Sequence, residues 1–198
     1  MDQPNQTMEE NTKWVPYGAL LLVLIVATGF WKIEKSRETP LIPYDEYVAQ
    51  NTPPTMDGKV APDFTLPALG GGEISLADYK GKIVFINIWA TWCAPCREEM
   101  PSMQKLYDRF RGDDFEMITI SIDKKETDVQ AFINELGLTF KVALDPTEKT
   151  SKEYKTTGVP ETYIVGRDGV IMHHIIGPGK WYTPQIISAF ERFIKGGN

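Results

Sequence analysis

Cysteine is scarce in this sequence, with only two residues among 198. Two thiols cannot build the disulfide framework of a small secreted fold, and they cannot fill a zinc site made of four thiolates. Basic residues are too few for a nucleic-acid-binding surface, since 21 Lys and Arg stand against 27 Asp and Glu and the net charge is −6. No internal repeat or low-complexity tract is present. A hydrophobic content of 42% indicates one packed domain with extra segments, in which the cysteine pair is either incidental or the functional centre.

Charged residues are missing from one stretch, residues 14–31, which lies between Lys13 and Lys32. A helix of this length reaches about 27 Å, close to the hydrocarbon thickness of a bilayer, and aromatic residues stand at both of its ends. We expect one retained transmembrane anchor, preceded by a short tail over residues 1–13. A cleaved signal peptide is the alternative, although the tail carries three acidic residues and one lysine, which makes a poor n-region.

Residues 32–59 contain several prolines and show no sustained hydrophobic period, so we expect a linker between the anchor and the rest of the chain. The charges on the two sides of the span bear on the orientation of the chain in the membrane. Three basic residues follow the span and one precedes it, which by itself would leave the large domain in the cytoplasm.

The remaining residues, 60–198, show the patterns of an α/β domain. Apolar runs rich in β-branched residues predict strands over 82–89, 115–122, 141–144, 162–165 and 170–176. Apolar residues at helical spacing predict helices over 100–112, 127–136 and 184–194. Thr127 with Gln130 suggests a capping box, and Gly137 suggests the end of that helix. The order β-α-β-α-β, followed by a hairpin and a helix, predicts a mixed sheet flanked by helices.

Both cysteines belong to one motif, Trp89-Ala-Thr-Trp-Cys-Ala-Pro-Cys96, which follows the first buried strand and opens a helix. Free amides and the positive end of the helix dipole favour a thiolate at Cys93. Cys96 lies one turn later, within reach of a disulfide, and Pro95 restricts the backbone between them. Lowering a thiol pKa from about 8.5 to about 7 takes roughly 2 kcal/mol, whereas a helix terminus supplies about 0.3–1 kcal/mol. Hydrogen bonds from the Cys96 side must therefore contribute to this redox-active pair.

Metal binding and inert thiols are the alternatives to redox chemistry. A metal would need further ligands, and the obvious candidates are His173 and His174. Consecutive residues of a strand point to opposite faces, so both cannot easily reach one metal. A partly exposed strand position without function is the other interpretation of each histidine. We expect no metal and no cofactor beyond the disulfide itself.

Three blocks of the sequence together resemble the thioredoxin superfamily, specifically its membrane-anchored TlpA/ResA-like branch. They are Ala61-Pro-Asp-Phe-Thr-Leu66 with Leu76-Ala-Asp-Tyr-Lys-Gly81, the segment from Trp89 to Cys96 with Glu98 and Pro101 after it, and Gly158-Val-Pro-Glu-Thr162. The resemblance implies a thioredoxin-like three-layer α/β sandwich with a mixed sheet and extra N-terminal strands, preceded by one transmembrane helix.

The resemblance also implies a substrate site around the cysteines. Val159-Pro160 would be a cis peptide bond facing the pair, and the backbone of Val159 would bind an extended substrate segment. Glu161 would tune the pKa of the pair, with a solvated strand-end carboxylate as the alternative. Trp92 would shape the contact surface, or it would only be hydrophobic cover. The candidate substrate-binding or pKa-tuning residues are therefore Trp92, Ala94, Pro95, Val159, Pro160 and Glu161.

Two positions depart from the pattern of relatives. Asn87 stands where thioredoxins proper have a buried Asp, and Asn cannot accept a proton, so we expect Glu161 or water to be the proton acceptor. Ala94 stands between the cysteines, where some close relatives have an acid, so the choice of substrate does not transfer directly from them.

We therefore predict a membrane-tethered thiol-disulfide oxidoreductase in which Cys93 attacks a substrate disulfide and Cys96 resolves the mixed disulfide. By resemblance the substrate is apocytochrome c during cytochrome c maturation, and a membrane electron donor re-reduces the pair. The alternatives are a general extracytoplasmic thiol reductase, a thiol oxidase, and a copper-binding chaperone that uses Cys93, Cys96 and a histidine. A thiol reductase is useful where disulfides form, so we expect the domain on the extracytoplasmic (periplasmic) side of the cell membrane.

Overall fold

The computed structural model describes residues 25–26, 28–29, 31–32, 55–112 and 114–196 of the chain. The chain divides into two units, residues 1–52 and 53–198. The described residues of the first unit are helical. Within the described residues, no helix combines the length and the apolar character needed to cross a membrane, and most of the predicted anchor, 14–31, lies outside them. The anchor, the tail over 1–13 and most of the linker therefore stay predictions.

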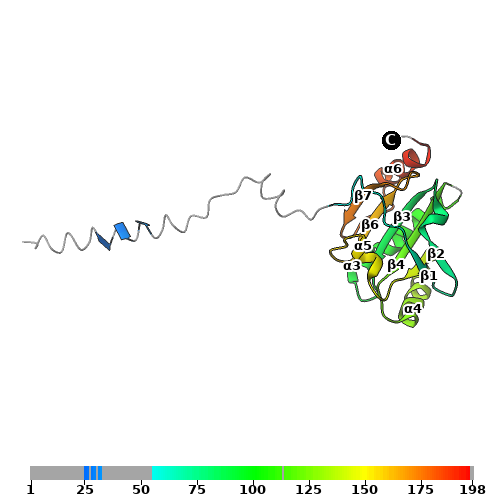
Figure 1. The fold of residues 1–198 in the computed structure, drawn as a ribbon, viewed down its shortest axis with the longest axis horizontal. Helices are drawn as coiled ribbons and strands as arrows, with labels where there is room; N and C mark the ends of the chain where they lie inside the picture. Colours follow the sequence, from blue (N-terminus) through cyan, green and yellow to red (C-terminus); the bar gives the residue numbers. More distant parts are fainter. Residues whose placement is uncertain (1–24, 27, 30, 33–54, 113, 197–198) are drawn as a thin grey trace, which may run out of the picture. The chain divides into compact units, whose positions relative to one another are not determined.

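The second unit is built on a five-stranded mixed sheet with the strand order β5-β4-β3-β6-β7 (Figure 1). Its strands are β3 (Ile83–Trp89), β4 (Phe115–Ser121), β5 (Lys141–Leu144), β6 (Glu161–Val165) and β7 (Ile171–Ile176). The first three are parallel, and β6 is antiparallel to both β3 and β7. Every residue of β3 and β4 is buried, as expected for near-continuous apolar strands covered on both faces. The predicted mixed sheet is confirmed.

Helices and coil cover both faces of this sheet. The helices are α3 (Ala94–Phe110), α4 (Glu126–Leu136), α5 (Lys149–Glu153), α6 (Pro184–Ile194) and the short 3-10 helix η1 (Leu76–Tyr79). One core joins α3, α4 and α6 to the sheet face that carries Phe85 and Trp89. A second core lies on the opposite face around Ile86 and Tyr163, where the segment that begins with Met56 packs against the sheet. The predicted three-layer thioredoxin-like arrangement is confirmed.

The extra N-terminal strands implied by the resemblance are also present. They are β1 (Thr65–Pro67) and β2 (Glu73–Ser75), which form a separate antiparallel pair. Ala68, just after β1, bridges to Ala143 on β5, so this hairpin is attached to the edge of the main sheet.

The folded unit begins earlier than the predicted linker boundary at residue 59. Met56 is already buried in the second core. Gly58 donates its N–H to the carbonyl of Ile171 at 2.8 Å, and Lys59 accepts from the N–H of the same residue at 2.8 Å. These backbone bonds to β7 add residues 56–59 to the domain.

The two helix ends predicted for residues 127–136 differ in outcome. The capping box predicted at Thr127 is wrong, because α4 starts one residue earlier and has no side-chain cap. Two acidic residues in its first turn, Glu126 and Asp128, favour the helix N-terminus instead. Gly137 ends this helix in a left-handed conformation, as predicted, and Thr183 caps α6 by accepting from the Ile186 N–H at 3.3 Å.

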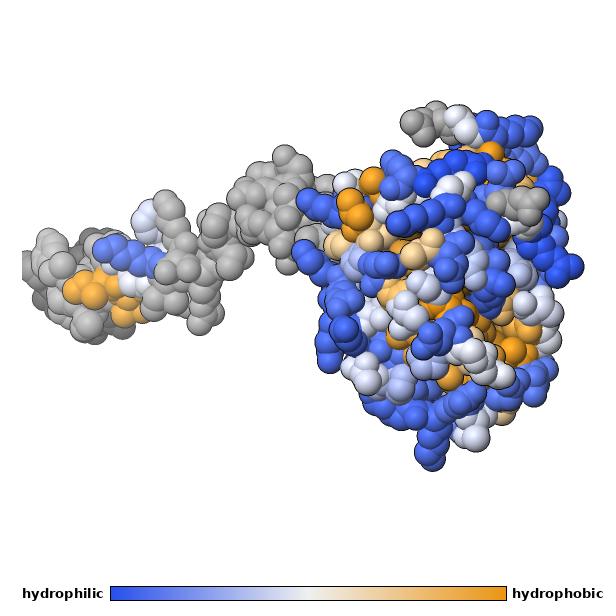
Figure 2. Space-filling model, turned by 45° about the vertical axis from the view of Figure 1, so that its right-hand side comes forward, coloured by the Kyte–Doolittle hydropathy of each residue, from blue (hydrophilic) through white to orange (hydrophobic). Residues whose placement is uncertain are grey.

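Most of the visible surface of the second unit is hydrophilic, and apolar residues show between polar ones at its centre and right and at its upper left (Figure 2). Among its described residues, the large hydrophobic side chains with substantial exposure are Val60, Trp92, Ile176 and Tyr182.

Candidate active site

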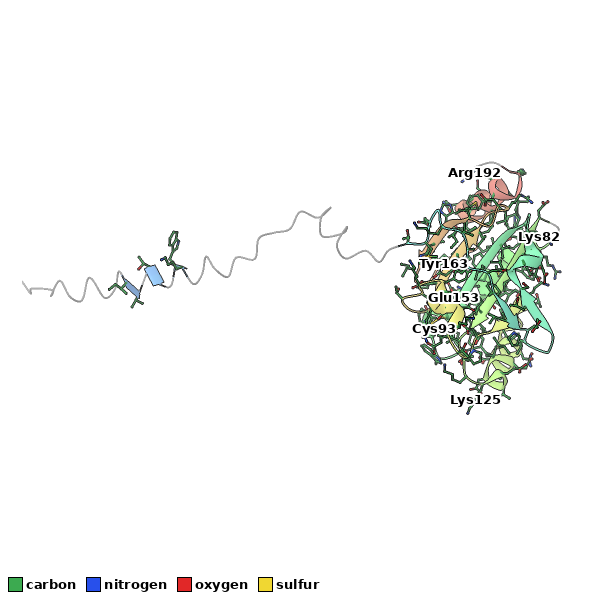
Figure 3. All side chains as sticks on the ribbon, viewed as in Figure 1. Lys82, Cys93, Lys125, Glu153, Tyr163 and Arg192 are labelled. Carbon is green, nitrogen blue, oxygen red and sulfur yellow. A yellow bond between two sulfur atoms is a disulfide. The ribbon has the colours of Figure 1, made fainter. Side chains whose placement is uncertain are left out.

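The cysteine pair lies where β3 passes into α3. Figure 3 shows Lys82 and Cys93 at opposite ends of the strand. Cys93 is the N-cap residue of α3, which begins at Ala94 and has Pro95 in its first turn, where a missing amide removes no helical hydrogen bond. Cys93 and Cys96 form a disulfide with an S–S distance of 2.05 Å. The two predicted catalytic residues are thus brought together in their oxidised form.

The two sulfurs have different surroundings. Cys93 Sγ accepts the N–H of Cys96 at 3.2 Å, which is the hydrogen bond expected to favour a thiolate at a helix start. Cys93 retains 5% exposure, whereas Cys96 is 0% exposed. Cys93 is therefore the cysteine nearer to the protein surface.

The loop before β6 faces Cys93. The Val159-Pro160 bond is cis, as the resemblance implied, and the carbonyl oxygen of Val159 lies 3.5 Å from Cys93 Sγ. Gly177 fixes the loop from the end of β7 by donating its N–H to the Pro160 carbonyl at 2.9 Å. The structure thus places the predicted substrate-binding backbone directly beside Cys93.

The turn that leads into the cysteines is held by Asp123, a residue that sequence reasoning missed. Its carboxylate accepts from the Thr91 N–H at 2.9 Å, from the Thr91 hydroxyl at 2.7 Å and from the Ser121 hydroxyl at 2.8 Å. The available signal was an acid two residues after a buried strand, at the edge where the cysteine motif also lies.

Trp92 is 69% exposed, and its role in shaping a contact surface and its alternative role as hydrophobic cover both stay predictions. A cleft of about 370 Å³ opens beside it, with Ile122 and Lys125 among the lining residues. Ala94 is exposed next to Cys93 and adds no charge there.

A buried carboxylate, Glu99, lies one helical turn after Cys96. Its Oε1 accepts from the Asn87 side-chain amide at 3.0 Å, and its Oε2 accepts from the Gly179 N–H at 2.8 Å and the Trp181 indole N–H at 2.7 Å. Burial raises the pKa of Glu99, and these three hydrogen bonds only partly offset that effect. Glu99 is therefore a carboxylate with raised proton affinity on the cysteine helix.

Glu99 was not predicted from the sequence, in which the family resemblance includes its exposed neighbour Glu98. A signal was available. Glu99 shares the helical face of Cys96 and Met103, three and four residues away, and these are buried core positions. An acid inside such a stripe needs hydrogen-bond partners, which identifies it as a candidate site residue.

Glu161 lies on the opposite face of the sheet from the cysteine helix. It pairs with Ile88 across β3 and β6, and Ile88 and Tyr163 belong to the second core, whereas Cys96 belongs to the first. Glu161 is buried, so its interpretation as a solvated strand-end carboxylate is wrong. Tuning of the cysteine pKa by Glu161 stays a prediction.

Five hydrogen bonds converge on Glu161. Oε1 accepts from the Thr157 N–H at 2.8 Å, the Thr157 hydroxyl at 2.6 Å and the Gly158 N–H at 3.1 Å. Oε2 accepts from the Tyr163 hydroxyl at 2.8 Å and lies 2.8 Å from His174 Nε2. Burial alone would raise the pKa of Glu161, but these hydrogen bonds outweigh it and hold the pKa below its usual value. The ionised carboxylate thus fixes the loop that carries the cis peptide bond.

His174 connects Glu161 to the start of the domain. Its Nδ1 accepts the N–H of Met56 at 3.2 Å, so Nε2 carries the proton and donates to Glu161. The predicted partly exposed position is wrong for His174, whose side chain is fully buried. His173 is exposed, with its ring 5.5 Å from that of Phe193.

The ligand set of a copper site is not assembled in the described part of the chain. His174 is on the face opposite Cys96 and is engaged by two partners. No group of three or more His, Cys, Asp or Glu side chains is arranged to hold a metal ion among the described residues.

Comparison with known proteins agrees with this geometry. Residues 58–174 match the model of the AhpC/TSA family. The chain belongs to this family. The thiol-disulfide oxidoreductase ResA of Bacillus thuringiensis (strain Al Hakam) is 40% identical over 120 residues, which cover 61% of this chain and 69% of the relative. ResA of Geobacillus kaustophilus (strain HTA426) is 32% identical over 170 residues, which cover 86% of this chain and 91% of the relative.

A solved structure shares the architecture of this AhpC/TSA-family chain. The crystal structure of a thiol:disulfide interchange protein, DsbE, from Chlorobium tepidum superposes with a TM-score of 0.61 at 29% identity, covering 72% of this chain and 98% of the other. The predicted relation to ResA-like proteins is confirmed, and the chain is a thiol-disulfide oxidoreductase.

Proposed function

We propose that this oxidoreductase is a reductase of protein disulfides, with Cys93 as the nucleophile and Cys96 as the resolving thiol. The asymmetry of the pair carries the proposal. Cys93 is the more exposed of the two cysteines, its Sγ is hydrogen-bonded by the Cys96 amide and lies 3.5 Å from the Val159 carbonyl, whereas Cys96 is 0% exposed. A protein substrate can add an extended segment along the Val159 backbone and present its disulfide to Cys93.

The reaction proceeds in two exchanges. The Cys93 thiolate attacks one sulfur of the substrate disulfide, the substrate S–S bond breaks, and a mixed disulfide forms while the leaving thiolate takes a proton from water. Cys96 then attacks Cys93 Sγ and releases the second substrate thiolate. Two electrons have passed to the substrate, and the Cys93–Cys96 disulfide remains, as in the structure.

Glu99 accepts the proton of Cys96 in the second exchange. The Cys96 thiol is buried and must lose its proton before it can attack. Glu99 is one turn away on the same helix, and its pKa is raised by burial, which makes its carboxylate a better base than an exposed one. Asn87 does not take this role itself, but it holds Oε1 of Glu99.

The setting of the reaction follows from the chemistry and from the sequence. Each turnover leaves the enzyme oxidised, so it needs a dithiol donor, and a membrane donor suits a tethered domain. Residues 14–31 anchor the chain in the cell membrane with the catalytic domain on the extracytoplasmic side, where disulfides form. Apocytochrome c is the substrate that the resemblance favours, and the redox group is the disulfide alone.

Insulin reduction by the full chain in detergent tests the catalytic assignment. Cys93→Ser is expected to lower the rate to background, and Cys96→Ser is expected to accumulate a mixed disulfide that survives on a non-reducing gel. Retention of activity by both variants would contradict the proposal. The reduction potential separates a reductase from an oxidase, since a value near that of thioredoxin, about −270 mV, is expected and a value near about −120 mV is typical of an oxidant.

Protease treatment of spheroplasts tests the location. Digestion of the domain is expected in intact spheroplasts, and protection until lysis would place it on the cytoplasmic side.

A further inference from the structure

The loop between β7 and α6 is hydrogen-bonded to the cysteine helix at three points. Gly179 N–H and Trp181 Nε1–H both donate to Oε2 of Glu99, at 2.8 and 2.7 Å. The Trp181 backbone N–H donates to the Ser102 hydroxyl at 3.1 Å, and that hydroxyl donates to the Glu99 carbonyl at 2.8 Å. This loop therefore binds the Glu99 side chain directly and is linked to the Glu99 backbone through Ser102.

The indole of Trp181 is held in one place. The ring is buried and meets Phe85 edge to face, with 4.8 Å between the centroids. Gly179 passes so close to this ring that a Cβ there would lie 2.4 Å from Cε2 and 2.6 Å from Cζ2 of Trp181. Glycine is required at this position for the amide and the indole to reach the same oxygen.

A buried carboxylate stays ionised only if donors replace the lost water. The groups that face the Glu99 carboxylate are neutral: Asn87 from β3, and Gly179 and Trp181 from the loop. No charged side chain in the described part of the chain forms a hydrogen bond or ion pair with it. Oε2 therefore depends on two donors that both come from the β7–α6 loop.

We propose that Trp181 and Gly179 are positioning residues for catalysis, which hold Oε2 of Glu99 as an ionised and oriented acceptor for the Cys96 proton. The proposal rests on the proposed function of Glu99 as the proton acceptor. Loss of the indole donor favours the protonated form of Glu99, so a higher pH is then needed to generate the base. The hydrogen bonds from Gly179 and Trp181 already lower a pKa that burial raises.

The two exchange steps can be followed separately with Ellman's disulfide, which releases one chromophore when Cys93 attacks and a second when Cys96 resolves the mixed disulfide. The reduced full chain is mixed with this reagent in a stopped-flow instrument from about pH 5 to about pH 9. Trp181→Phe keeps an aromatic ring against Phe85 and removes the N–H donor. We expect the pH midpoint of the second phase to move up by about one unit, with the first phase unchanged.

Two control variants disturb the same region without removing a donor to the carboxylate. Ser102→Ala removes the acceptor of the Trp181 backbone N–H, and Phe85→Leu weakens the packing of the indole. Both are expected to keep the wild-type midpoint. A wild-type profile in Trp181→Phe, or equal shifts in the controls, would overturn the proposal.

Glu99→Gln distinguishes the positioning role of Trp181 and Gly179 from the proton-acceptor role of Glu99. If it abolishes the pH dependence of the second phase while Trp181→Phe has no effect, the positioning role fails and the proton acceptor stands. If Glu99→Gln leaves the profile unchanged, the proton acceptor itself is wrong, and the positioning role fails with it.

A measurement on the wild-type chain covers the case in which Trp181→Phe does not fold. Five indole N–H signals are expected from ¹⁵N-tryptophan labelling. One of them should shift with pH along the titration of Glu99, and this shift should disappear in Glu99→Gln. Five pH-independent signals would contradict the proposed contact.

Discussion

Glu99 and Glu161 are both buried, lie on opposite faces of the central sheet and are held in different ways. Glu99, on the face of the cysteine helix, accepts three hydrogen bonds from neutral donors, and its pKa is raised by burial. Glu161, on the opposite face, accepts five, and these outweigh burial and lower its pKa. Burial therefore dominates at Glu99 and favours its protonated form, whereas the hydrogen bonds dominate at Glu161 and favour its ionised form.

This difference in pKa assigns different roles to the two glutamates in the proposed mechanism. Glu99 lies on the cysteine helix, and in the proposed mechanism it changes its protonation state during a turnover. Glu161 keeps a fixed charge that holds Thr157 and Gly158, and through them the Val159-Pro160 backbone that faces Cys93. His174 extends this fixed network to Met56, where the folded unit begins.

Among the substitutions that distinguish the two glutamates, Glu99→Gln is expected to have the largest effect on activity. Resolution of the mixed disulfide by Cys96 should slow by about 100-fold near neutral pH, because the proton acceptor is lost. Stability should change little. In the wild type, Asn87 Oδ1 has no hydrogen-bond partner among the described residues. After the Asn87 side chain flips, Oδ1 can accept a hydrogen bond from the new side-chain amide of the Glu99→Gln variant. Stopped-flow kinetics and urea unfolding check the two halves of this prediction. A variant that resolves at the wild-type rate would break the comparison.

Glu161→Gln should give the opposite pattern. An amide in place of Oε2 would face two donors, the Tyr163 hydroxyl and His174 Nε2–H, and would leave buried donors unsatisfied. We expect the free energy of unfolding to fall by about 2–3 kcal/mol in urea. The first exchange should slow, because the loop beside Cys93 loses its anchor, while the second keeps its pH profile. If Glu161→Gln is as stable as the wild type, the hydrogen bonds to Glu161 do not anchor the loop as described.

The local parts of this architecture could be predicted from the sequence. Neighbouring residues define the strand before the cysteines, the helix start at Cys93 and the helix end at Gly137. The local sequence is therefore enough to predict each of them. The capping box at Thr127 failed because the match to a motif does not show which residue leaves the helical conformation first. The short helix α5 was not predicted, since five residues are too few for a periodic pattern.

The two glutamates could not be assigned in the same way, because their environments come from distant parts of the chain. Glu99 obtains its donors from residues 179 and 181, and Glu161 depends on the position of β7 and of Met56. The sequence therefore predicts Glu161, next to the cis peptide bond, or water as the proton acceptor. The sheet register places Glu161 and Cys96 on opposite faces, and for this reason the proposed proton acceptor is Glu99 rather than Glu161.

A smaller effect is expected in the pH dependence of stability, with opposite signs for the two residues. The lowered pKa of Glu161 stabilises the fold above the usual value of 4.5, and this contribution is lost as the pH falls through the lowered pKa. The raised pKa of Glu99 destabilises the fold at neutral pH, and this cost is relieved as the pH falls toward 4.5. Thermal unfolding of the wild type, Glu99→Gln and Glu161→Gln across this range should show differences that run in opposite directions. Parallel curves would contradict the comparison.

The smallest effect is expected from an exposed carboxylate near the same helix. Glu135 pairs with Arg97 at 2.6 Å, but both side chains are solvent-accessible. Glu135→Gln should leave stability and both exchange rates unchanged, because solvent screens such pairs. This variant is the matched control for the removal of a charge without the removal of a buried hydrogen-bond network. A loss comparable to that of Glu161→Gln would show that charge, rather than the buried network, is responsible.

Direct titration of the two carboxyl groups tests the central difference. The full chain, labelled with ¹³C at the glutamate side-chain carboxyl carbons, is titrated by NMR, with Glu99→Gln and Glu161→Gln used to assign the two signals. Glu99 should titrate above the usual value of 4.5 and Glu161 below it. The reverse order, or a common midpoint for both, would contradict the assignment of one glutamate to proton transfer and the other to holding the substrate loop.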